Sequence, residues 1–234
     1  MDAKSHALPA PPFREATRVL TSVLAPLEKR TLVWLATRMP RRVNSDHLTL
    51  LALVAMVGAG FSYWLASVSP LGLLLVVVCL AVNWFGDSLD GTLARVRGHQ
   101  RPRYGFYVDH VVDLAGTAAL LGGLALSGYM QPIVALGLLA AYFMVTAETF
   151  LATHSVGTFT MSFCKIGPTE LRILLAIGSL VLLVHPRAQL FGHDFLLFDV
   201  GGVVGSVGLL STLAVSAVTN TRALYRAEPL PGSR

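Results

Sequence analysis

Four aspartates with regular spacing lie between two long apolar runs of the chain. The segment that contains them, residues 87–113, reads DSLDGTLARVRGHQRPRYGFYVDHVVD. Asp87 and Asp90 are three residues apart and Asp109 and Asp113 are four apart, so each pair shares one face of a helix. An antiparallel helix pair joined by the basic turn between them would bring the four carboxylates together. Such a half-buried cluster is costly unless divalent cations neutralise it, so the spacing predicts a metal-dependent site.

The composition places the chain in a membrane. Of its 234 residues, 54% are hydrophobic and only 13% are charged, and the mean hydropathy is +0.64, which is unusual for a soluble domain. Six apolar runs approach or reach the length that spans a bilayer; they are residues 48–66, 71–84, 111–126, 133–148, 171–184 and 196–218. The sequence therefore predicts an all-α integral membrane protein with six transmembrane helices.

Four segments are predicted along the chain. Residues 1–12 are rich in proline and alanine and have no hydrophobic period, which indicates a disordered tail. In residues 13–42 the apolar residues recur at helical spacing, which predicts an N-terminal amphipathic interfacial helix on the cytoplasmic leaflet. The alternative is an ordinary helix that packs on the same protein. Residues 43–223 form the six-helix membrane domain, and residues 224–234 form a cytoplasmic tail.

The distribution of basic residues predicts the orientation. Lysines and arginines precede the first span, follow the second, precede the fifth and follow the sixth, and only Arg187 falls on the opposite side. By the positive-inside rule, both termini and the aspartate cluster are cytoplasmic. A basic face toward anionic lipid headgroups also accounts for the isoelectric point of about 9.6, without nucleic acid as a partner.

The spacing of the motif resembles the signature of the CDP-alcohol phosphotransferase family, DxxDGxxAR…GxxxDxxxD. All eight signature positions are present; they are Asp87, Asp90, Gly91, Ala94, Arg95, Gly105, Asp109 and Asp113. The resemblance extends from about Asn44 to the C-terminus. The gap of nine residues after Arg95 is one longer than the commoner eight, and a loop can absorb this difference.

The resemblance implies an enzyme that displaces CMP from a CDP-linked alcohol, with an acceptor hydroxyl as nucleophile and two divalent cations, Mg²⁺ or Mn²⁺, as cofactors. Two ions about 4 Å apart can bind a diphosphate and stabilise the developing charge. The metal ligands implied are Asp87, Asp90, Asp109 and Asp113. The residues implied in binding the CDP moiety are Gly91, Ala94, Arg95 and Gly105. The first general base to consider is Asp113, one turn from Asp109.

Two further residues are candidates for the base role. His110 directly follows Asp109, and this Asp-His-x-x-Asp form resembles the choline/ethanolamine phosphotransferase branch of the family. So does the segment 154–170, HSVGTFTMSFCKIGPTE, which ends in Glu170. We therefore expect His110 and Glu170 to share or assist the base role. The alternatives are a hydrogen-bonded interfacial histidine and a favourable acid in the first turn of a helix.

The expected function is phospholipid synthesis by transfer of a substituted phosphate, with a phosphatidyl group as the first choice. The alternative is transfer from CDP-choline or CDP-ethanolamine to diacylglycerol. The partners implied are a CDP-linked donor and an alcohol acceptor, one of them a lipid, with membrane lipids and a second copy of the chain in a homodimer. The compact length resembles the bacterial phosphatidyl-transferring members, which predicts a bacterial inner membrane with the active site on its cytoplasmic side.

Other classes of protein fit the motif less well. A transporter also buries carboxylates, but it does not need glycine, alanine and arginine at fixed offsets from them. Intramembrane prenyltransferases bind diphosphates through metals, but they have two separated Asp-rich segments and more spans. A catalytically inactive lipid-binding scaffold would not need the complete set of aspartates.

Overall fold

The computed structural model describes residues 17–19, 25–160, 167–228 and 230 of the chain. The tail predicted for residues 1–12 lies outside these described residues. The C-terminal tail predicted from residue 224 is helical as far as Ala227. Residues 229 and 231–234 lie outside the described part.

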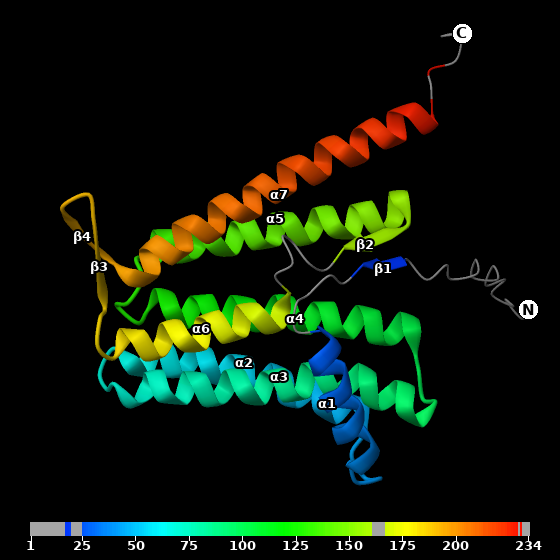
Figure 1. Cartoon of the computed structure of the whole chain (residues 1–234), viewed down its shortest axis with the longest axis horizontal. Coiled ribbons are helices and arrows are strands. Elements are labelled where there is room, and N and C mark those ends of the chain that lie inside the picture. Colours follow the sequence, from blue (N-terminus) through cyan, green and yellow to red (C-terminus); the bar gives the residue numbers. More distant parts are fainter. Residues whose placement is uncertain (1–16, 20–24, 161–166, 229, 231–234) are drawn as a thin grey trace, which may run out of the picture.

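Seven α-helices make up most of the described structure. They are α1 (Ala25–Arg38), α2 (Ser45–Ala66), α3 (Leu71–Arg97), α4 (Pro102–Ala125), α5 (Pro132–Val156), α6 (Pro168–Leu182) and α7 (Leu197–Ala227). Helices α2 to α6 run side by side, α1 crosses α3 at a steep angle, and α7 diverges from α5 toward its C-terminal end (Figure 1). The bundle is held by α2 against α3 and α4, α4 against α5, α5 against α7, and α6 against α3.

Local sequence signals set the helix ends. The Asn44 side chain caps α2 by accepting a hydrogen bond from the His47 amide at 3.0 Å. Helix α3 is capped after Arg97 by Gly98, whose φ of 68° lies in the left-handed region that glycine adopts without strain. Helix α4 begins at Pro102, where the missing amide hydrogen has no cost. The short turn between Gly98 and Pro102 makes α3 and α4 antiparallel neighbours.

Short strands interrupt the helical pattern, and sequence periodicity predicted none of them. Strand β1 (Thr17–Val19) pairs in parallel with β2 (Thr158–Thr160), which follows α5. The prediction of one interfacial helix from residue 13 is therefore wrong at β1, and among the described residues α1 runs from Ala25 to Arg38. Strands β3 (Arg187–Leu190) and β4 (His193–Leu196) form an antiparallel hairpin between α6 and α7.

Five helices of the described chain are long and apolar enough to cross a membrane: α2, α3, α4, α5 and α7. The all-helical membrane class is thus confirmed, but the count of six spans is not. Helix α6 has only 15 residues and reaches about 22 Å at 1.5 Å per residue, less than the roughly 30 Å of hydrocarbon. It nevertheless runs alongside α3 and leads to the β3–β4 hairpin at one end of the bundle (Figure 1).

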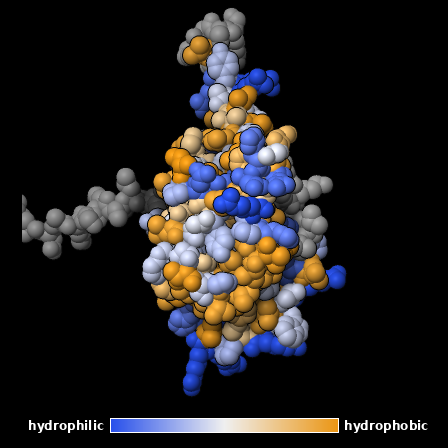
Figure 2. All heavy atoms as spheres, turned by 90° about the vertical axis from the view of Figure 1, so that its left-hand side faces the viewer, coloured by the Kyte–Doolittle hydropathy of each residue, from blue (hydrophilic) through white to orange (hydrophobic). Residues whose placement is uncertain are grey.

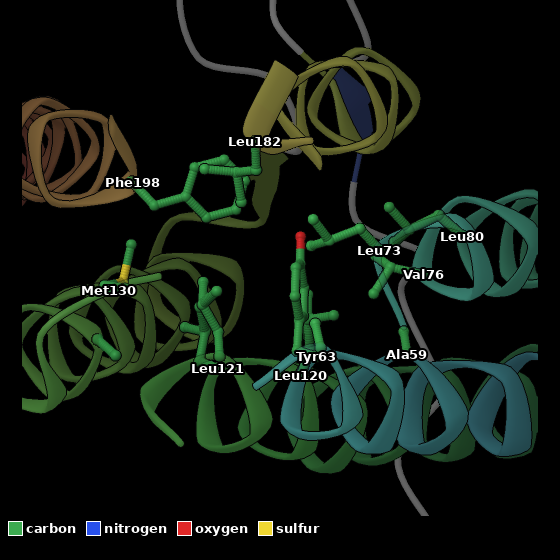
Figure 3. Packing of buried hydrophobic residues seen from close by; sticks show 13 residues of the cluster. Ala59, Tyr63, Leu73, Val76, Leu80, Leu120, Leu121, Met130, Leu182 and Phe198 are labelled. Carbon is green, nitrogen blue, oxygen red and sulfur yellow. The ribbon is translucent and has the colours of Figure 1, made fainter. Parts of the chain in front are cut away.

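Two buried clusters hold the helices together. The larger one surrounds Tyr63, whose ring is fully buried and whose hydroxyl points toward α6 (Figure 3). That hydroxyl lies 2.8 Å from Oγ of Ser179, so the buried polar groups satisfy each other. The smaller cluster joins α1 to α2 and α3 through Leu32, Ala36 and Leu89, among others. Asp87 on α3 and Asp109 and Asp113 on α4 each lie, in the sequence, between a residue of one cluster and a residue of the other.

The outer surface is largely apolar, as expected in lipid. Only 6% of the most apolar stretch of α7 is buried in the protein. Val204, Val207 and Val215 are among the exposed residues of this helix. At the end of the bundle where the β3–β4 hairpin lies, hydrophobic residues cover much of the surface, with hydrophilic ones interspersed (Figure 2). The exposed apolar side chains of α7 favour an apolar solvent around the bundle.

Candidate metal centre

Three of the four motif aspartates converge between α3 and α4. Asp87 on α3 and Asp109 and Asp113 on α4 each place one carboxylate oxygen within 4.8 Å of the others. All three residues are half-buried. The short turn that joins the two helices brings their acidic faces together, so the predicted approach of the two aspartate pairs is present for these three residues.

The fourth aspartate, Asp90, lies one helical turn beyond Asp87 and outside this group of three. Its Oδ2 accepts a hydrogen bond from Oγ1 of Thr49 at 2.6 Å, and its backbone carbonyl accepts one from Oγ of Ser45 at 2.9 Å. Both donors belong to α2. Asp90 also interacts electrostatically with Asp87 and Asp113. Helix α2 thus orients the carboxylate that lies at the edge of the acidic group.

A guanidinium on α6 joins the acidic group to α3. Nη2 of Arg172 donates to Oδ2 of Asp87 at 2.5 Å, and its Nε donates to Oδ1 of Asn83 at 2.7 Å. The amide of Asn83, which is buried, donates in turn to the carbonyl of Ala52 at 3.0 Å. Nη1 of Arg172 is buried and has no hydrogen-bond partner within the described residues. A buried donor without a partner is energetically costly, so this nitrogen is available to donate a hydrogen bond to an oxygen of a bound ligand.

The glycines of the motif are not explained by helix packing. Within the described part of the chain, a Cβ added to Gly105 would meet nothing within 4 Å, and one added to Gly91 would meet only Nη1 of Arg95 at 3.6 Å, an ordinary contact. Gly60, by contrast, packs so closely that an added Cβ would lie 2.2 Å from the carbonyl oxygen of Ala119. The space beside Gly91 and Gly105 could admit a ligand, and their role in binding the CDP moiety stays a prediction.

A cleft of about 390 Å³ opens at the same end of the bundle, between the start of α2 and the end of α3. Ala94 lines it, together with Ser45, whose hydroxyl also contacts Asp90. Asp46 accepts a hydrogen bond from Arg101 at its mouth. This bond raises the pKa of Arg101 above the usual arginine value, so Arg101 stays charged beside the Asp46 carboxylate. The exposed motif residue Arg95 donates from Nη2 to Oγ1 of Thr92 at 2.9 Å.

His110 and Glu170 have structural contacts of their own. Nδ1–H of His110 donates to the carbonyl of Phe106 at 2.6 Å, and the imidazole packs against the rings of Phe106 and Phe150. Nδ1 of His110 is 3.9 Å from Oδ2 of Asp109. Oε2 of Glu170 accepts from the Gly167 amide at 3.0 Å and so caps the start of α6. The assignment of either residue as a base stays a prediction.

Comparison with known proteins decides the family. Residues 43–215, which include all of α2 to α6 and the acidic group, match the CDP-alcohol phosphatidyltransferase family. The chain belongs to this family. An archaetidylinositol phosphate synthase from Pyrococcus horikoshii is 26% identical over 167 residues, which cover 70% of this chain and 81% of that protein. The protein is therefore a transferase of phospholipid synthesis with membrane helices, and the expected enzyme class is confirmed.

The donor set of this phosphatidyltransferase fits divalent cations. Three carboxylates meet in a half-buried place with Asp90 beside them, and the Arg172 guanidinium pairs with Asp87. Carboxylate oxygens are the ligands that Mg²⁺ and Mn²⁺ prefer. Ligand oxygens around one ion, at bonds of about 2.1 Å, are at most about 4.2 Å apart. The three oxygens lie within 4.8 Å of one another, so small side-chain movements would suffice for them to share an ion.

Sequence reasoning missed the contacts that surround the motif of the phosphatidyltransferase. Arg172 is one of the basic residues near the start of the fifth predicted span, where the positive-inside rule alone would explain it, but it pairs with Asp87. The signal was Asn83, a polar residue within an otherwise apolar run, whose amide side chain needs partners in a membrane. Nothing in the sequence predicted that Thr49, on the facing helix α2, would donate a hydrogen bond to Asp90.

Proposed function

We propose that this phosphatidyltransferase transfers a phosphatidyl group from a CDP-linked lipid to the hydroxyl of a small polar alcohol and releases CMP. The observation that carries the proposal is the convergence of Asp87, Asp109 and Asp113 beside open glycine surfaces in helices that span a membrane. A diphosphate linked to both a nucleotide and a lipid needs this combination of polar site and apolar surroundings.

The acidic group would hold two Mg²⁺ or Mn²⁺ ions through Asp87, Asp90, Asp109 and Asp113. When bound, the ions supply Lewis-acid stabilisation of the diphosphate charge. The ion pair with Arg172 holds the carboxylate of Asp87 in place, and the hydrogen bond from Thr49 holds that of Asp90. The chain thus arranges the ligand oxygens before the ions and the donor bind.

Asp113 is the proposed general base. It accepts the proton of the acceptor hydroxyl while the hydroxyl oxygen forms a bond to the phosphorus of the phosphatidyl group. The bond between that phosphorus and the bridging oxygen breaks, and CMP leaves with the bond electrons. Buried Nη1 of Arg172 is available for a phosphate oxygen of the substrates.

The cleft beside Ala94 is the proposed place of the cytidine. It opens at the end of α3 where the basic loop lies, so a nucleotide can enter from water while its lipid remains in the bilayer. Arg97 and Arg101 line the cleft, and only Arg187 lies in the hairpin at the other end. This charge asymmetry supports a cytoplasmic location of the site.

A panel of substrates tests the proposal. Purified protein in liposomes is offered CDP-diacylglycerol, CDP-choline or CDP-ethanolamine, each with radiolabelled alcohols and diacylglycerol as acceptors. The relative from P. horikoshii is named for archaetidylinositol phosphate, so inositol phosphate belongs in the acceptor panel. We expect CMP release and labelled lipid only with the CDP-lipid, Mg²⁺ or Mn²⁺, and a polar alcohol.

The outcomes separate the alternatives. Turnover with CDP-choline or CDP-ethanolamine and diacylglycerol would move the enzyme to the other branch, which the His110 and Glu170 residues resemble. Full turnover in excess chelator would rule out the two-metal site. An Asp109→Ala variant serves as the inactive control, because it removes one of the three converging carboxylates.

A further inference from the structure

A carboxylate outside the motif lies at the junction of three helices. Glu28, in the first turn of α1, accepts three hydrogen bonds through its Oε1. The donors are Nε1 of Trp84 at 2.8 Å, Oγ of Ser88 at 3.1 Å and Oγ1 of Thr169 at 2.7 Å. Trp84 and Ser88 belong to α3 and Thr169 belongs to α6. One oxygen from α1 therefore bridges α3 and α6.

The three donors lie next to the residues of the candidate metal centre. Ser88 directly follows Asp87 on α3. Thr169 precedes Arg172 by three residues on α6, so the two share a helical face. The bridge through Glu28 and the pair of Arg172 with Asp87 thus join the same two helices one turn apart.

Helix α1 is itself fixed on α3, which makes Glu28 a firm attachment. Leu32 and Ala36 are buried against Leu89 and Leu93 of α3, at 7% and 2% exposure. Leu32 and Ala36 follow Glu28 by four and eight residues and so continue its face of α1. The carboxylate therefore reaches α6 from a helix that cannot easily move away from α3.

We propose that Glu28 is a positioning residue of the metal centre, which sets the distance of α6 from α3 so that Arg172 meets Asp87. The inference rests on the proposed function and adds a residue outside the signature motif to it. Without the bridge, three donors lose their acceptor and the first turn of α6 is held to α3 there mainly by Arg172. Asp87 then loses its fixed orientation toward the ions.

The experiment compares Mn²⁺ binding by electron paramagnetic resonance, in the full chain in lipid nanodiscs without substrate. The variants are Glu28→Ala, Glu28→Gln and Thr169→Val. Loss of an outer-shell partner weakens metal binding by about 10- to 100-fold in other proteins, so we expect about a 10-fold higher Kd for Glu28→Ala. Glu28→Gln keeps an acceptor oxygen and should stay within about 3-fold of the unmodified protein.

Glu148→Ala is the matched control. The Glu148 carboxylate on α5 also accepts from side-chain donors, namely Oγ of Ser216 at 2.9 Å and Nδ2 of Asn220 at 2.8 Å, both on α7. It makes a comparable bridge between two helices, but at neither α3 nor α6. We expect Glu148→Ala to lower the unfolding temperature and to leave the Kd for Mn²⁺ unchanged.

The result that overturns the proposal is a Kd of Glu28→Ala within 2-fold of the unmodified protein, or a Glu148→Ala variant that is weakened equally. Should Glu28→Ala fail to fold, Thr169→Val decides, because it removes one hydroxyl without changing the side-chain shape. An unchanged Kd in Thr169→Val would then refute the role. Failure of the unmodified protein to bind Mn²⁺ would instead refute the metal centre itself.

Discussion

Arg172 on α6 and Asp87 on α3 form an ion pair with 2.5 Å between Nη2 and Oδ2. Their side chains are only 15% and 20% exposed, so the pair is largely removed from water. The same guanidinium also holds Asn83, which leaves its orientation little freedom. A carboxylate of the acidic group is thereby locked by a residue 85 positions further along the chain.

Replacing Arg172 should damage both the fold and the metal centre. Arg172→Gln leaves the Asp87 carboxylate without its cation, and breaking a buried pair costs about 3 kcal/mol or more. Arg172→Lys keeps the charge but cannot reach Asn83 and Asp87 together, since an ammonium lacks the planar fork. We expect at least a 10-fold loss of turnover in Arg172→Lys with a smaller loss of stability. Thermal unfolding and CMP release measure the two effects, and full activity in Arg172→Lys would contradict the role.

Asp113 and Asp90 should be separable by substitution. Asp113→Asn keeps the shape of the side chain but cannot take the acceptor's proton, so the chemical step should fall on the order of 100- to 10,000-fold. Binding of the CDP-donor should fall much less than turnover in this variant. Asp90→Asn should weaken metal and donor binding together. Isothermal titration with the donor, independent of turnover, makes the comparison.

The base assignment has a clear contrary outcome. Near-normal turnover in Asp113→Asn, with loss of turnover in His110→Ala or Glu170→Gln, would move the base role to those residues. Glu170→Gln is the informative variant because it keeps the side-chain shape. Its amide oxygen can still accept a hydrogen bond from the Gly167 backbone N–H and cap α6.

The motif glycines should show opposite effects on stability and activity. Gly91→Ala and Gly105→Ala add a methyl group where there is space, and alanine favours a helix by about 0.5–1 kcal/mol over glycine. We expect unchanged or higher unfolding temperatures, together with a KM for the CDP-donor raised about 10-fold by contact with the added methyl group. Gly60→Ala is the control, since its Cβ would overlap the backbone of α4 and destabilise the protein. A normal KM in both motif variants would show that the space is not used by the donor.

Cysteine labelling in intact cells tests the orientation. Single cysteines are placed at Arg101, in the α3–α4 turn, and at Ser69, in the α2–α3 turn, in a chain whose Cys79 and Cys164 are replaced by serine. The two turns lie at opposite ends of α3, so an impermeant reagent should reach only one of them. We expect labelling at position 69 and protection at position 101. The reverse pattern would put the candidate site on the outer side of the membrane.

Much of the candidate site followed from sequence because its spacing is local. Asp109 and Asp113 share a face of α4, and the short turn from Gly98 to Pro102 makes α3 and α4 antiparallel. Asp87 must then face the two acids of α4 over a limited range of helix rotations. Apolar runs predicted the long helices for a similar reason, since a bilayer sets their length.

The parts that sequence could not predict depend on how helices are placed relative to one another. Thr49 binds Asp90 only because α2 turns this side chain toward α3. The spacing of apolar residues in α2 does not predict that rotation. Helix α6 was predicted as a full span from its apolar run, but it begins at Pro168 and ends at Leu182. The pairing of β1 with β2 joins residues about 140 positions apart, and no repeating pattern in the sequence predicts it.

The sequence by itself determined the family, the membrane class and the four acids, because these depend on residue types at fixed short spacings. Only the tertiary structure decided which side chains hold those acids. Glu28 meets Thr169 across 141 positions and Arg172 meets Asp87 across 85. Such contacts depend on the rotation and shift of whole helices, which the packing of many side chains fixes together and no local pattern encodes.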